Sequence, residues 1–460
     1  MAVSSFTVDG RRVVVVGAAR SGIAAAELLQ RRGAIVTLTE SRTAFDDAGR
    51  LAAAGIQLEL GGHTAATLAG ADLIVVSPGV PLEQPVFDEA RQRGVEIIGE
   101  LEMASRWLKG RVVAVTGTKG KSTTTTVIGR MMNAAGRHVL VGGNIGVPLS
   151  AQVEASTEDT LHIVEVSSFQ LAATTTFRPW IAVWLNLTDD HLDRHGTLQE
   201  YGDAKARIFA GQGPSDFDVI NADDPAVTKY SSQTFAKRVW FSLSGRIAEG
   251  YVVEGQWIVR KTALSSERLL SVSAVELPGQ HMLGNVIAAA AAADLAGASP
   301  RSMDQGVRGF AGLEHVLEPA GAIGGVRFVN DSKATNVGAA CKSIESFAAG
   351  VVAIVGGRYK GGDFKELRAA LDRRGRAVVA IGEAAPLIES ALEGAVPVLR
   401  AGSMAEAVTR AHEAAGADGL VLLAPACASF DWFSDYAERG RSFKEEVARL
   451  KARIENSEPA

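Results

Sequence analysis

The sequence predicts an α/β protein of three domains, each built around a mainly parallel sheet. At 460 residues the chain is too long for one ordinary core, and about 150 residues per domain gives three. Apolar runs of strand length alternate with helical segments, and this alternation restarts twice along the chain. The composition, 47% hydrophobic and 22% charged with 49 glycines, is typical of a folded globular α/β protein.

The boundaries of the three domains follow from where each alternation begins. The expected first domain covers residues 1–105, with a helix from Ser21 and strands at residues 13–16, 35–38 and 73–76. The expected central domain covers residues 106–312, with a helix at residues 122–135 and strands at residues 112–115, 139–141, 162–166 and 181–185. Short alternating segments between residues 238 and 276 predict antiparallel hairpins attached to it. The expected third domain covers residues 313–460, with strands at residues 327–329, 351–355, 378–381 and 421–423.

Charge and cysteine content exclude several classes of function. A net charge of -5 and a pI near 6.0 leave no basic stripe for a phosphate backbone, so we expect no nucleic-acid partner. Two cysteines, Cys341 and Cys427, can form neither a disulfide framework nor a four-thiolate zinc site, which fits a reducing cytoplasm. The N-terminus lacks the apolar core of a signal peptide, and no apolar run approaches the roughly 18 residues of a membrane helix. We therefore expect a cytoplasmic monomer without a membrane partner.

A glycine turn follows the first expected strand, in the stretch VVVVGAARSG. Gly17 and Gly22 lie where a strand passes into a helix, and Glu40 ends the next strand, as in a dinucleotide-binding turn. Ala19 replaces the middle glycine that allows close approach to a pyrophosphate, so NAD binding is disfavoured. The helix start at Ser21 still offers backbone N–H groups to a phosphate. An ordinary tight turn explains the motif equally well.

The loop TGTKGKST, residues 116–123, is a stronger phosphate-binding signal. It follows a buried strand and opens a helix, where successive backbone N–H groups form a nest for an anion. Lys121 would reach the β- and γ-phosphates of a nucleotide, and Ser122 would offer its hydroxyl to Mg²⁺. Val115 stands where a full Walker A motif has its first glycine, so a plain glycine turn remains the minority interpretation.

Polar residues follow the next strands of the central domain. Glu165 ends the strand in HIVEVSSFQ, and because carboxyl ends of parallel strands share one edge, Glu165 and Ser122 are expected in one crevice. The segment NLTDDHLDRHG adds further candidates for metal binding: Asp189, Asp190, His191 and Asp193. Magnesium prefers oxygen, so a lone His191 is ordinarily structural, and Asp193 with Arg194 equally fits a helix cap. Lys205, in AKARIF, reads by itself as a solvated surface charge.

Taken together and in order, GTKGKST, EVSSFQ, NLTDDHLDRHG, AKARIF and NDSKATN resemble the Mur ligases of peptidoglycan synthesis, over the whole chain. Within that family NDSKATNVGA, GGRYKGGDF and PACASFDWF look like the D-glutamate-adding members, and the DNPR-type segment of the diaminopimelate-adding members is absent. The resemblance implies a Rossmann-like N-terminal domain, a P-loop ATPase-like central domain and a Rossmann-like C-terminal domain. It also implies an ATP-dependent amide ligase whose small-molecule substrates are UDP-N-acetylmuramoyl-L-alanine and D-glutamate, joined through an acyl phosphate.

The same resemblance implies how the central residues act. Lys205 matches a family lysine that is carbamylated, a change that turns a cation into a carboxylate-like ligand, whereas an ammonium group would repel Mg²⁺. Ser122 and Glu165 would hold one of two Mg²⁺ ions, and His191 with carbamylated Lys205 would hold the other. The implied catalytic residues are Lys121, Glu165, His191, Lys205 and Lys333.

Three sets of binding residues follow from the same matching. The implied ATP-binding residues are Gly117, Thr118, Lys119, Gly120, Lys121, Ser122, Thr123, Asn285 and Asp331. The implied UDP-substrate residues are Arg20, Ser21, Glu40, Ser41, Arg42, Ser77, Gly79, Asn144, Ser167, Gln170 and His191. The implied D-glutamate residues are Lys333, Thr335, Lys360, Ser429 and Tyr436, cations and hydroxyls that suit a dicarboxylic amino acid. The UDP-substrate residues that lie in the first domain are explained equally well as loop and helix-cap residues.

Two departures from the family pattern fall on the ATP side. Met282 replaces an amide of the family's His-Asn-x-x-Asn segment, and Val316 replaces an arginine in GLEHVLE. Lys119, where the family usually has asparagine, adds a cation in the loop, which we interpret as a compensation for these losses.

Three other functions remain alternatives at this stage. A related amide ligase, such as a folylpolyglutamate-synthase-like enzyme or another Mur enzyme, would share the central domain. An NAD-dependent dehydrogenase would use the first glycine turn, and a non-catalytic nucleotide-binding module would need neither Glu165 nor Lys205.

Overall fold

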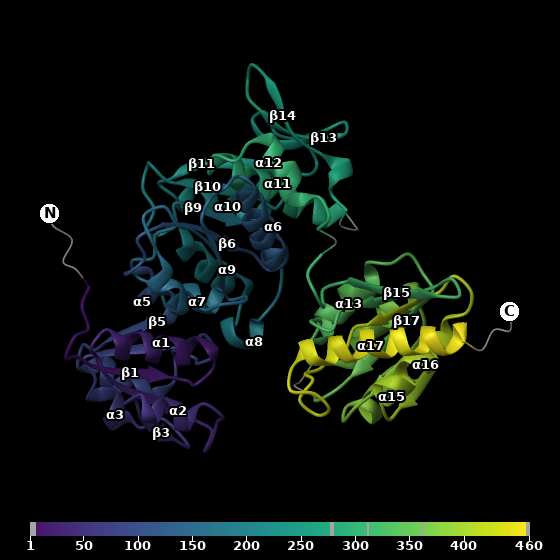
Figure 1. Ribbon diagram of the computed structural model, residues 1–460, viewed down its shortest axis with the longest axis horizontal. Coiled ribbons are helices and arrows are strands. Elements are labelled where there is room, and N and C mark those ends of the chain that lie inside the picture. Colours follow the sequence, from purple (N-terminus) through teal and green to yellow (C-terminus); the bar gives the residue numbers. More distant parts are fainter. Residues whose placement is uncertain (1–5, 277–279, 311, 360–361, 457–460) are drawn as a thin grey trace. The chain divides into compact units, whose positions relative to one another are not determined.

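The computed structural model describes residues 6–276, 280–310, 312–359 and 362–456 (Figure 1). The chain forms two compact units, which divide after Phe310, and each unit is described by itself. The first unit contains two β-sheets and the second contains one. No helix among the described residues is long and apolar enough to cross a membrane.

The first sheet has five parallel strands in the order β3-β2-β1-β4-β5. Its strands are β1 (Arg12–Val16), β2 (Ile35–Glu40), β3 (Gln57–Leu60), β4 (Leu73–Val76) and β5 (Glu96–Gly99). Its helices are α1 (Arg20–Arg31), α2 (Ala48–Ala53), α3 (Ala65–Ala69), α4 (Asp88–Gln92) and α5 (Glu100–Ser105). The strand order reverses beside β1, so the glycine turn after β1 opens at the point where ligands bind in sheets of this kind.

The central sheet has nine strands in the order β14-β13-β12-β11-β10-β9-β6-β8-β7. Its strands are β6 (Arg111–Thr116), β7 (Val139–Gly143), β8 (Leu161–Glu165), β9 (Ile181–Trp184), β10 (Phe217–Asn221), β11 (Lys237–Ser242), β12 (Gly250–Glu254), β13 (Trp257–Lys261) and β14 (Ser266–Ser271). Its helices are α6 (Lys121–Ala134), α7 (Ser168–Ala172), α8 (Leu192–His195), α9 (Leu198–Ala206), α10 (Pro225–Tyr230), α11 (Gln280–Leu295) and α12 (Pro300–Val307). The carboxyl ends of β6, β8 and β9 meet at one edge, where the predicted site residues follow them.

The segment expected to form only antiparallel hairpins is partly different. β12, β13 and β14 are antiparallel, as predicted. β11 instead pairs in parallel with β10 and with β12, so the hairpins continue the central sheet rather than stand beside it. Alternation of apolar and polar residues marks a half-exposed strand but does not carry the direction of its partner, which explains the error.

The third sheet has six strands in the order β15-β16-β20-β17-β18-β19, of which only β15 is antiparallel to its neighbour. Its strands are β15 (Glu318–Ile323), β16 (Val326–Asn330), β17 (Val351–Gly356), β18 (Gly375–Ile381), β19 (Val398–Ala401) and β20 (Leu420–Leu423). Its helices are α13 (Val337–Glu345), α14 (Leu367–Arg374), α15 (Ala385–Leu392), α16 (Met404–Ala415) and α17 (Tyr436–Glu455). Alternate residues of β17 pack on opposite faces, with α13, α14 and α15 on one side and α16 and α17 on the other.

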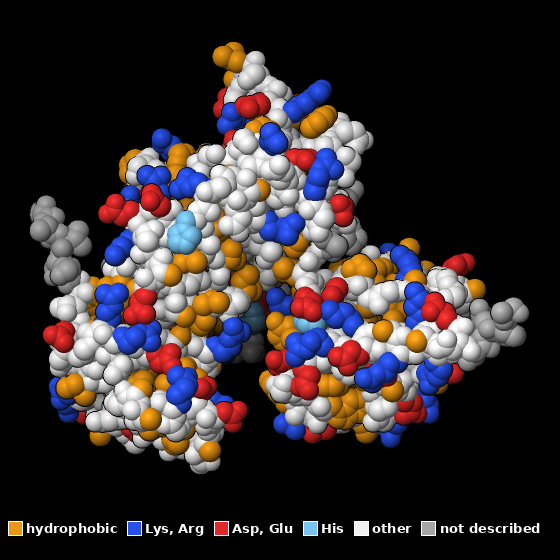
Figure 2. All heavy atoms as spheres, viewed as in Figure 1, with side chains coloured by type: hydrophobic (Ala, Val, Ile, Leu, Met, Phe, Trp, Pro, Cys, Tyr) orange, Lys and Arg blue, Asp and Glu red, His pale blue; other side chains and the backbone are white. Residues whose placement is uncertain are grey.

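One hydrophobic core joins the first two sheets. Val13 and Val15 of β1 belong to the same buried cluster as Trp184 at the end of β9 and Phe209 after α9. This shared core explains why the first two predicted domains form one compact unit. On the face of the molecule in Figure 2, described Lys and Arg side chains are interspersed with Asp and Glu and form no basic stripe.

Candidate active site

The loop after β6 depends on two glycines with positive φ. Gly117 has φ +148° and Gly120 has φ +82°, a region that other residues rarely adopt. A Cβ at Gly120 would collide with the side-chain amide of Asn285, which α11 packs against the loop. The structure therefore brings Asn285 to the loop, as the sequence predicts for the ATP side. Met282 is buried one turn earlier on α11, and its sulfur accepts from Asn285 Nδ2 at 3.7 Å.

Asn186, a residue that we did not single out from the sequence, holds this loop in place. Its backbone carbonyl accepts from the Thr118 N–H at 3.0 Å, and its Oδ1 accepts from the Lys119 N–H at 2.8 Å. Its Nδ2 donates to the Lys119 carbonyl at 3.0 Å. Asn186 is the first polar residue after β9, a position that could have identified it.

Two lysines converge on one carbonyl of the loop. Lys121 Nζ donates to the carbonyl oxygens of Gly117 at 3.0 Å and Thr118 at 2.9 Å. Lys205 Nζ, from α9, donates to the same Gly117 oxygen at 2.9 Å. Lys205 is 1% exposed, and its ammonium group lies 4.5 Å from the centre of the Tyr201 ring. The expectation of a solvated surface charge, drawn from this segment alone, is therefore wrong.

The surroundings of Lys205 favour the neutral amine. Burial lowers the pKa of Lys205 well below its ordinary value, and the positive charge of Lys121 lowers it further. Asp190 and Glu165 act in the opposite direction without reversing the shift. A neutral amine is the form that reacts with carbon dioxide.

Glu165 ends β8 with one oxygen bonded and one oxygen without a partner among the described residues. Its Oε1 accepts from Asn144 Nδ2 at 2.7 Å, and its backbone carbonyl accepts from the Asn144 N–H at 2.9 Å. Its Oε2 is buried and has no hydrogen-bond partner. An unpartnered buried carboxylate oxygen is costly unless a cation or donor reaches it, so Glu165 fits a Mg²⁺ ligand.

His191 lies at the start of α8 with a left-handed backbone, at φ +56°. Its side chain is 45% exposed, 4.0 Å from Asp190 Oδ2, and edge-on to the Phe169 ring at 5.0 Å. Arg194 stacks on Phe169 and donates to the Gly79 carbonyl at 3.3 Å. The side chain of Asp193 lies outside the described residues. Among described side chains, no three His, Cys, Asp or Glu groups form a metal cluster.

The glycine turn after β1 holds a carboxylate of its own chain. Glu40 is 7% exposed and accepts from the Ala18 N–H at 2.7 Å, Ser41 Oγ at 3.0 Å, the Arg42 N–H at 3.1 Å and the Arg42 guanidinium at 3.2 Å. Burial alone would raise the pKa of the Glu40 carboxyl, but the hydrogen bonds from Arg42, Ala18 and Ser41 outweigh it and lower the pKa to about 2. Glu40 is therefore an ionised hydrogen-bond acceptor.

The remaining residues predicted for the UDP-substrate lie around this turn and along the edge of the central sheet. Ser77 Oγ donates to the Gly17 carbonyl at 2.8 Å, and Gly79 is exposed two residues later. Arg20 donates to the Gly146 carbonyl, which links α1 to the loop that carries Asn144, and Ser21 is half-buried in the first turn of α1. Ser167 and Gln170 form a capping box at the start of α7.

In the second unit, several predicted residues share one end of the sheet. Both carboxylate oxygens of Asp331, after β16, accept hydrogen bonds, from the Leu317 N–H at 3.2 Å and from Ser343 Oγ. The Ser332 hydroxyl donates to the Tyr436 carbonyl at 2.7 Å, which places the loop after β16 beside the start of α17. Lys333 and Thr335 are half-buried, Ser429 is buried and Tyr436 is exposed. Lys360 lies outside the described residues.

Arg439, which the sequence did not reveal, ties this end of the sheet together. It is 1% exposed and donates to Ser332 Oγ at 3.0 Å, the Ser332 carbonyl at 2.9 Å and the Cys427 carbonyl at 3.1 Å. Burial lowers the pKa of its guanidinium to about 10, so it remains charged at neutral pH. Val316, where the family has arginine, is half-buried.

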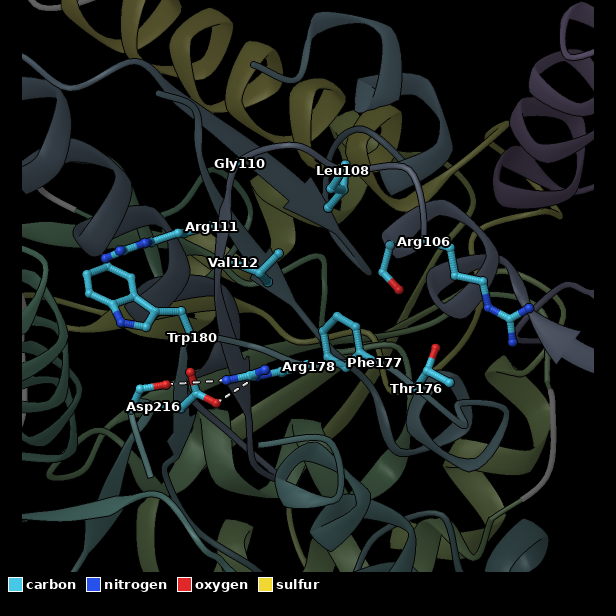
Figure 3. Close-up of a pocket in the computed structure, with 12 residues that line it drawn as sticks. Arg106, Leu108, Gly110, Arg111, Val112, Thr176, Phe177, Arg178, Trp180 and Asp216 are labelled. Carbon is cyan, nitrogen blue, oxygen red and sulfur yellow. Dashed lines mark hydrogen bonds and ion pairs between the residues drawn. The ribbon is translucent and has the colours of Figure 1, made fainter. Parts of the chain in front are cut away.

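A hollow of about 440 Å³ in the first unit lies away from these residues (Figure 3). It opens beside Arg111, where β6 begins, at the sheet edge opposite the glycine loop. Arg178 pairs there with Asp216 at 2.8 Å, and Arg111 stacks on Trp180. None of the predicted site residues lines this hollow, so its size does not identify the active site.

Comparisons with known proteins cover most of the chain. Three family models match: "Mur ligase MurD-like, N-terminal domain" over residues 11–99, "Mur ligase middle domain" over 115–293 and "Mur ligase, glutamate ligase domain" over 317–427. A UDP-N-acetylmuramoylalanine–D-glutamate ligase of Acidobacterium capsulatum is 47% identical over 95% of this chain and 96% of its own length. An enzyme of the same name from Pelotomaculum thermopropionicum is 43% identical over 96% of this chain and 98% of its own.

Solved structures of low sequence identity share the fold. The UDP-N-acetylmuramate-alanine ligase of Thermotoga maritima superposes with a TM-score of 0.60 at 19% identity, covering 96% of this chain and 100% of its own. The MurF ligase of Thermotoga maritima, solved in complex with ADP, has a TM-score of 0.56 at 18% identity and covers 96% of both chains. These matches confirm the predicted α/β fold class and the family resemblance, and the chain belongs to the Mur ligase family.

Proposed function

We propose that this protein joins D-glutamate to UDP-N-acetylmuramoyl-L-alanine at the expense of ATP, forming an amide bond in peptidoglycan precursor synthesis. Identity of 38–47% to curated D-glutamate ligases over almost the full chain supports the substrates. The observation that carries the chemistry is the convergence of Lys121 and Lys205 on Gly117, beside the glycine loop of β6.

In the proposed reaction, a substrate carboxylate oxygen attacks the γ-phosphorus of ATP, and the bond from that phosphorus to ADP breaks. The D-glutamate amine then attacks the acyl phosphate carbon, and phosphate leaves as the amide forms. The protein acts chiefly by positioning and electrostatics, because both steps transfer groups between bound substrates. Lys121 would leave the loop carbonyls that it now contacts and neutralise charge on the transferred phosphoryl group.

The proposed Mg²⁺ site uses residues that the fold brings to the carboxyl edge of the central sheet. Mg²⁺ would supply positive charge to the phosphate oxygens. Ser122 and Glu165 would hold one ion, with the unpartnered Glu165 Oε2 as the ligand oxygen. His191 and carbamylated Lys205 would hold a second, and the ring contact with Phe169 orients His191.

The binding sets from the sequence become part of the proposal. The N–H-rich loop at residues 117–123 with Asn285 would bind ATP, and Asp331 would bind its ribose. Glu40, with its neighbours in the first turn, would accept hydrogen bonds from the UDP moiety, since it is ionised and already oriented. Lys333, Thr335, Lys360, Ser429 and Tyr436 would form the D-glutamate pocket. We assign these roles to three domains, residues 1–105, 106–312 and 313–460, of a cytoplasmic monomer.

A phosphate-release assay tests this function. Purified protein with ATP, Mg²⁺ and UDP-N-acetylmuramoyl-L-alanine should release phosphate when D-glutamate is added. Release with diaminopimelate instead, or release on addition of L-alanine to UDP-N-acetylmuramate, would assign another Mur activity, and activity toward folate substrates would assign the folylpolyglutamate class. No amino-acid-dependent ADP at all would favour a dehydrogenase or a non-catalytic module. Sedimentation velocity tests the monomer.

Replacement of Glu165 tests the metal assignment. Glu165→Gln keeps the hydrogen bond from Asn144 but removes the negative charge, so half-saturation by Mg²⁺ should shift to higher concentration. The matched control is Glu158→Gln, at an exposed acid before the same strand. An unchanged Mg²⁺ dependence would remove Glu165 from the proposed site.

A further inference from the structure

A small cavity of about 10 Å³ lies within the first unit, between the carboxyl edge of the first sheet and helix α7. It is lined by side chains and backbone that follow β4, by the junction of β5 and α5, and by α7, including Ser77, Glu100, Phe169 and Gln170. The end of β5 and the end of α7 lie in direct contact here, because the Gly99 N–H donates to the Ala173 carbonyl at 2.8 Å.

Two buried polar atoms around this cavity have no hydrogen-bond partner among the described residues. They are Glu100 Oε2 and Gln170 Nε2. Glu100 is 1% exposed and Gln170 is 2% exposed, so bulk water does not reach them. Unsatisfied buried polar groups of this kind are rare in folded proteins, and each requires an explanation.

The second polar atom of each side chain, Glu100 Oε1 and Gln170 Oε1, already has hydrogen-bond partners. Glu100 Oε1 accepts from both the N–H and the hydroxyl of Ser150, each at 2.6 Å. Gln170 Oε1 accepts from the Ser167 N–H at 3.0 Å and the Ser167 hydroxyl at 3.2 Å. Turning the Gln170 amide over would point its Nε2 at the Ser167 N–H, donor against donor. Both residues line the cavity, and Glu100 Oε2 and Gln170 Nε2 are the side-chain atoms that remain to bond a molecule there.

A cavity of this size suits a single water molecule, which needs roughly 10–15 Å³ and two to four polar partners. Water both donates and accepts, so it satisfies Gln170 Nε2 and Glu100 Oε2 together. Burial raises the pKa of Glu100, and a water molecule also satisfies the protonated carboxyl, as an acceptor. Ser77 Oγ, whose proton goes to the Gly17 carbonyl, offers lone pairs at the same cavity.

We propose that one water molecule in this cavity bridges Glu100 Oε2 to Gln170 Nε2, and that Glu100 is thereby a positioning residue for Gln170 and Ser167. The consequence for catalysis rests on the proposed function, in which Ser167 and Gln170 contact the UDP-substrate. Without the bridge only the contacts with Ser167 hold the Gln170 side chain, and the capping box that orients Ser167 loosens.

The bridge is tested first by a double-mutant cycle on equilibrium unfolding, which needs no activity. Glu100→Leu and Gln170→Leu should each destabilise the protein, and the double variant should be no less stable than the worse single variant. Gln152→Leu is the matched control, because Gln152 is also a buried glutamine but does not line the cavity. Its effect should add to that of Glu100→Leu. Additive effects of Glu100→Leu and Gln170→Leu would overturn the proposal.

Kinetics test the positioning role. Glu100→Leu should raise KM for UDP-N-acetylmuramoyl-L-alanine about tenfold, as expected for one lost hydrogen-bonded contact, and leave KM for ATP within about twofold. Glu100→Gln keeps an acceptor for Ser150 and gives the water a donor, so it should restore KM. Because it removes no polar group, this variant also serves as the test if the leucine variant fails to fold. An equal rise of KM for ATP and the UDP-substrate, or a glutamine variant as impaired as the leucine one, would overturn the role. If the wild-type protein lacks ligase activity, the proposed function fails, while the unfolding cycle still decides the bridge.

Discussion

Two turns of the first unit connect a buried strand to a helix through glycines, yet they suit opposite charges. In the turn after β1, the Ala18 N–H donates to Glu40, a carboxylate of the chain itself. In the turn after β6, the Lys121 ammonium group and Lys205 Nζ both donate to the Gly117 carbonyl, and burial favours the neutral amine at Lys205. The first turn already contains the negative charge of Glu40, whereas the second contains the positive charge of Lys121.

This difference decides what each turn can bind. A phosphate beside α1 would approach ionised Glu40, so hydroxyl and N–H donors of a ligand suit this turn better. A phosphate beside α6 would meet the helix N-terminus together with Lys121. Similar strand-glycine-helix patterns would therefore suit a donor-rich ligand at one sheet and a polyphosphate at the other.

The largest expected effect comes from the second turn. Lys205→Ala should lower kcat about 10³-fold, because it removes the proposed carbamate ligand and leaves a buried gap beside Gly117. Short carboxylates such as acetate or formate should restore part of the activity by filling that gap. The control is Lys229→Ala, at an exposed lysine of α10. Phosphate release that is lost but not rescued at any carboxylate concentration would argue against the carbamate.

The glycine loop shows how far sequence reasoning reaches. Gly117, Gly120, Lys121 and Glu165 were located from local patterns, since a strand, a turn and a helix start are encoded by neighbouring residues. The burial of Lys205 could not be read from AKARIF, because it depends on α9 packing against a loop almost ninety positions earlier, where Lys205 reaches Gly117. The family resemblance, and not the local pattern, singled out Lys205 in the sequence.

Asn186 and Arg439, which we did not identify from the sequence, act through long-range contacts. Asn186 and Arg439 bind backbone groups of other segments, and nothing in their immediate neighbours signals those partners. The same limit applies to β11, whose parallel pairing depends on where β10 lies and not on its own alternation. Local chemistry is therefore readable from the chain, whereas the partners of single polar side chains are not.

The first turn should give a smaller effect, confined to one substrate. Glu40→Gln should raise KM for the UDP-substrate about tenfold and leave kcat within about twofold, because the amide replaces an acceptor oxygen by a donor that faces the Ala18 N–H or the Arg42 guanidinium. Steady-state kinetics with each substrate varied in turn measure this. Glu59→Gln, at a half-buried residue of β3 that bonds to the Thr64 N–H, makes the same charge change and serves as the control. A loss in kcat alone would contradict the assignment.

Glu40 should also make stability depend on pH in the acid range. Its pKa is lowered from 4.5 to about 2 on folding, so its contribution is complete above about pH 4.5 and is lost as pH falls toward 2. After allowance for the exposed Arg42 partner, roughly 1–3 kcal/mol is expected. Urea unfolding of the wild type and Glu40→Gln should therefore differ most above pH 4.5 and converge near pH 2. A difference that grows toward acid would have the wrong sign.

The smallest expected effect concerns Lys119, the unusual cation of the second turn. Asn186 bonds to both the N–H and the carbonyl of Lys119, so Lys119→Asn changes the charge without changing the path of the loop. The Lys119 side chain is exposed, and its attraction to a phosphate is screened by water and salt. KM for ATP should therefore rise only about two- to threefold at low ionic strength, and the difference from wild type should vanish as salt is added. Lys109→Asn makes the same charge change near the opposite end of β6, and it should leave KM for ATP unaltered. Equal KM values for wild type and Lys119→Asn at low salt would mean that this cation does not compensate for Met282 and Val316, and that the second turn draws its attraction for phosphate from Lys121 and the start of α6.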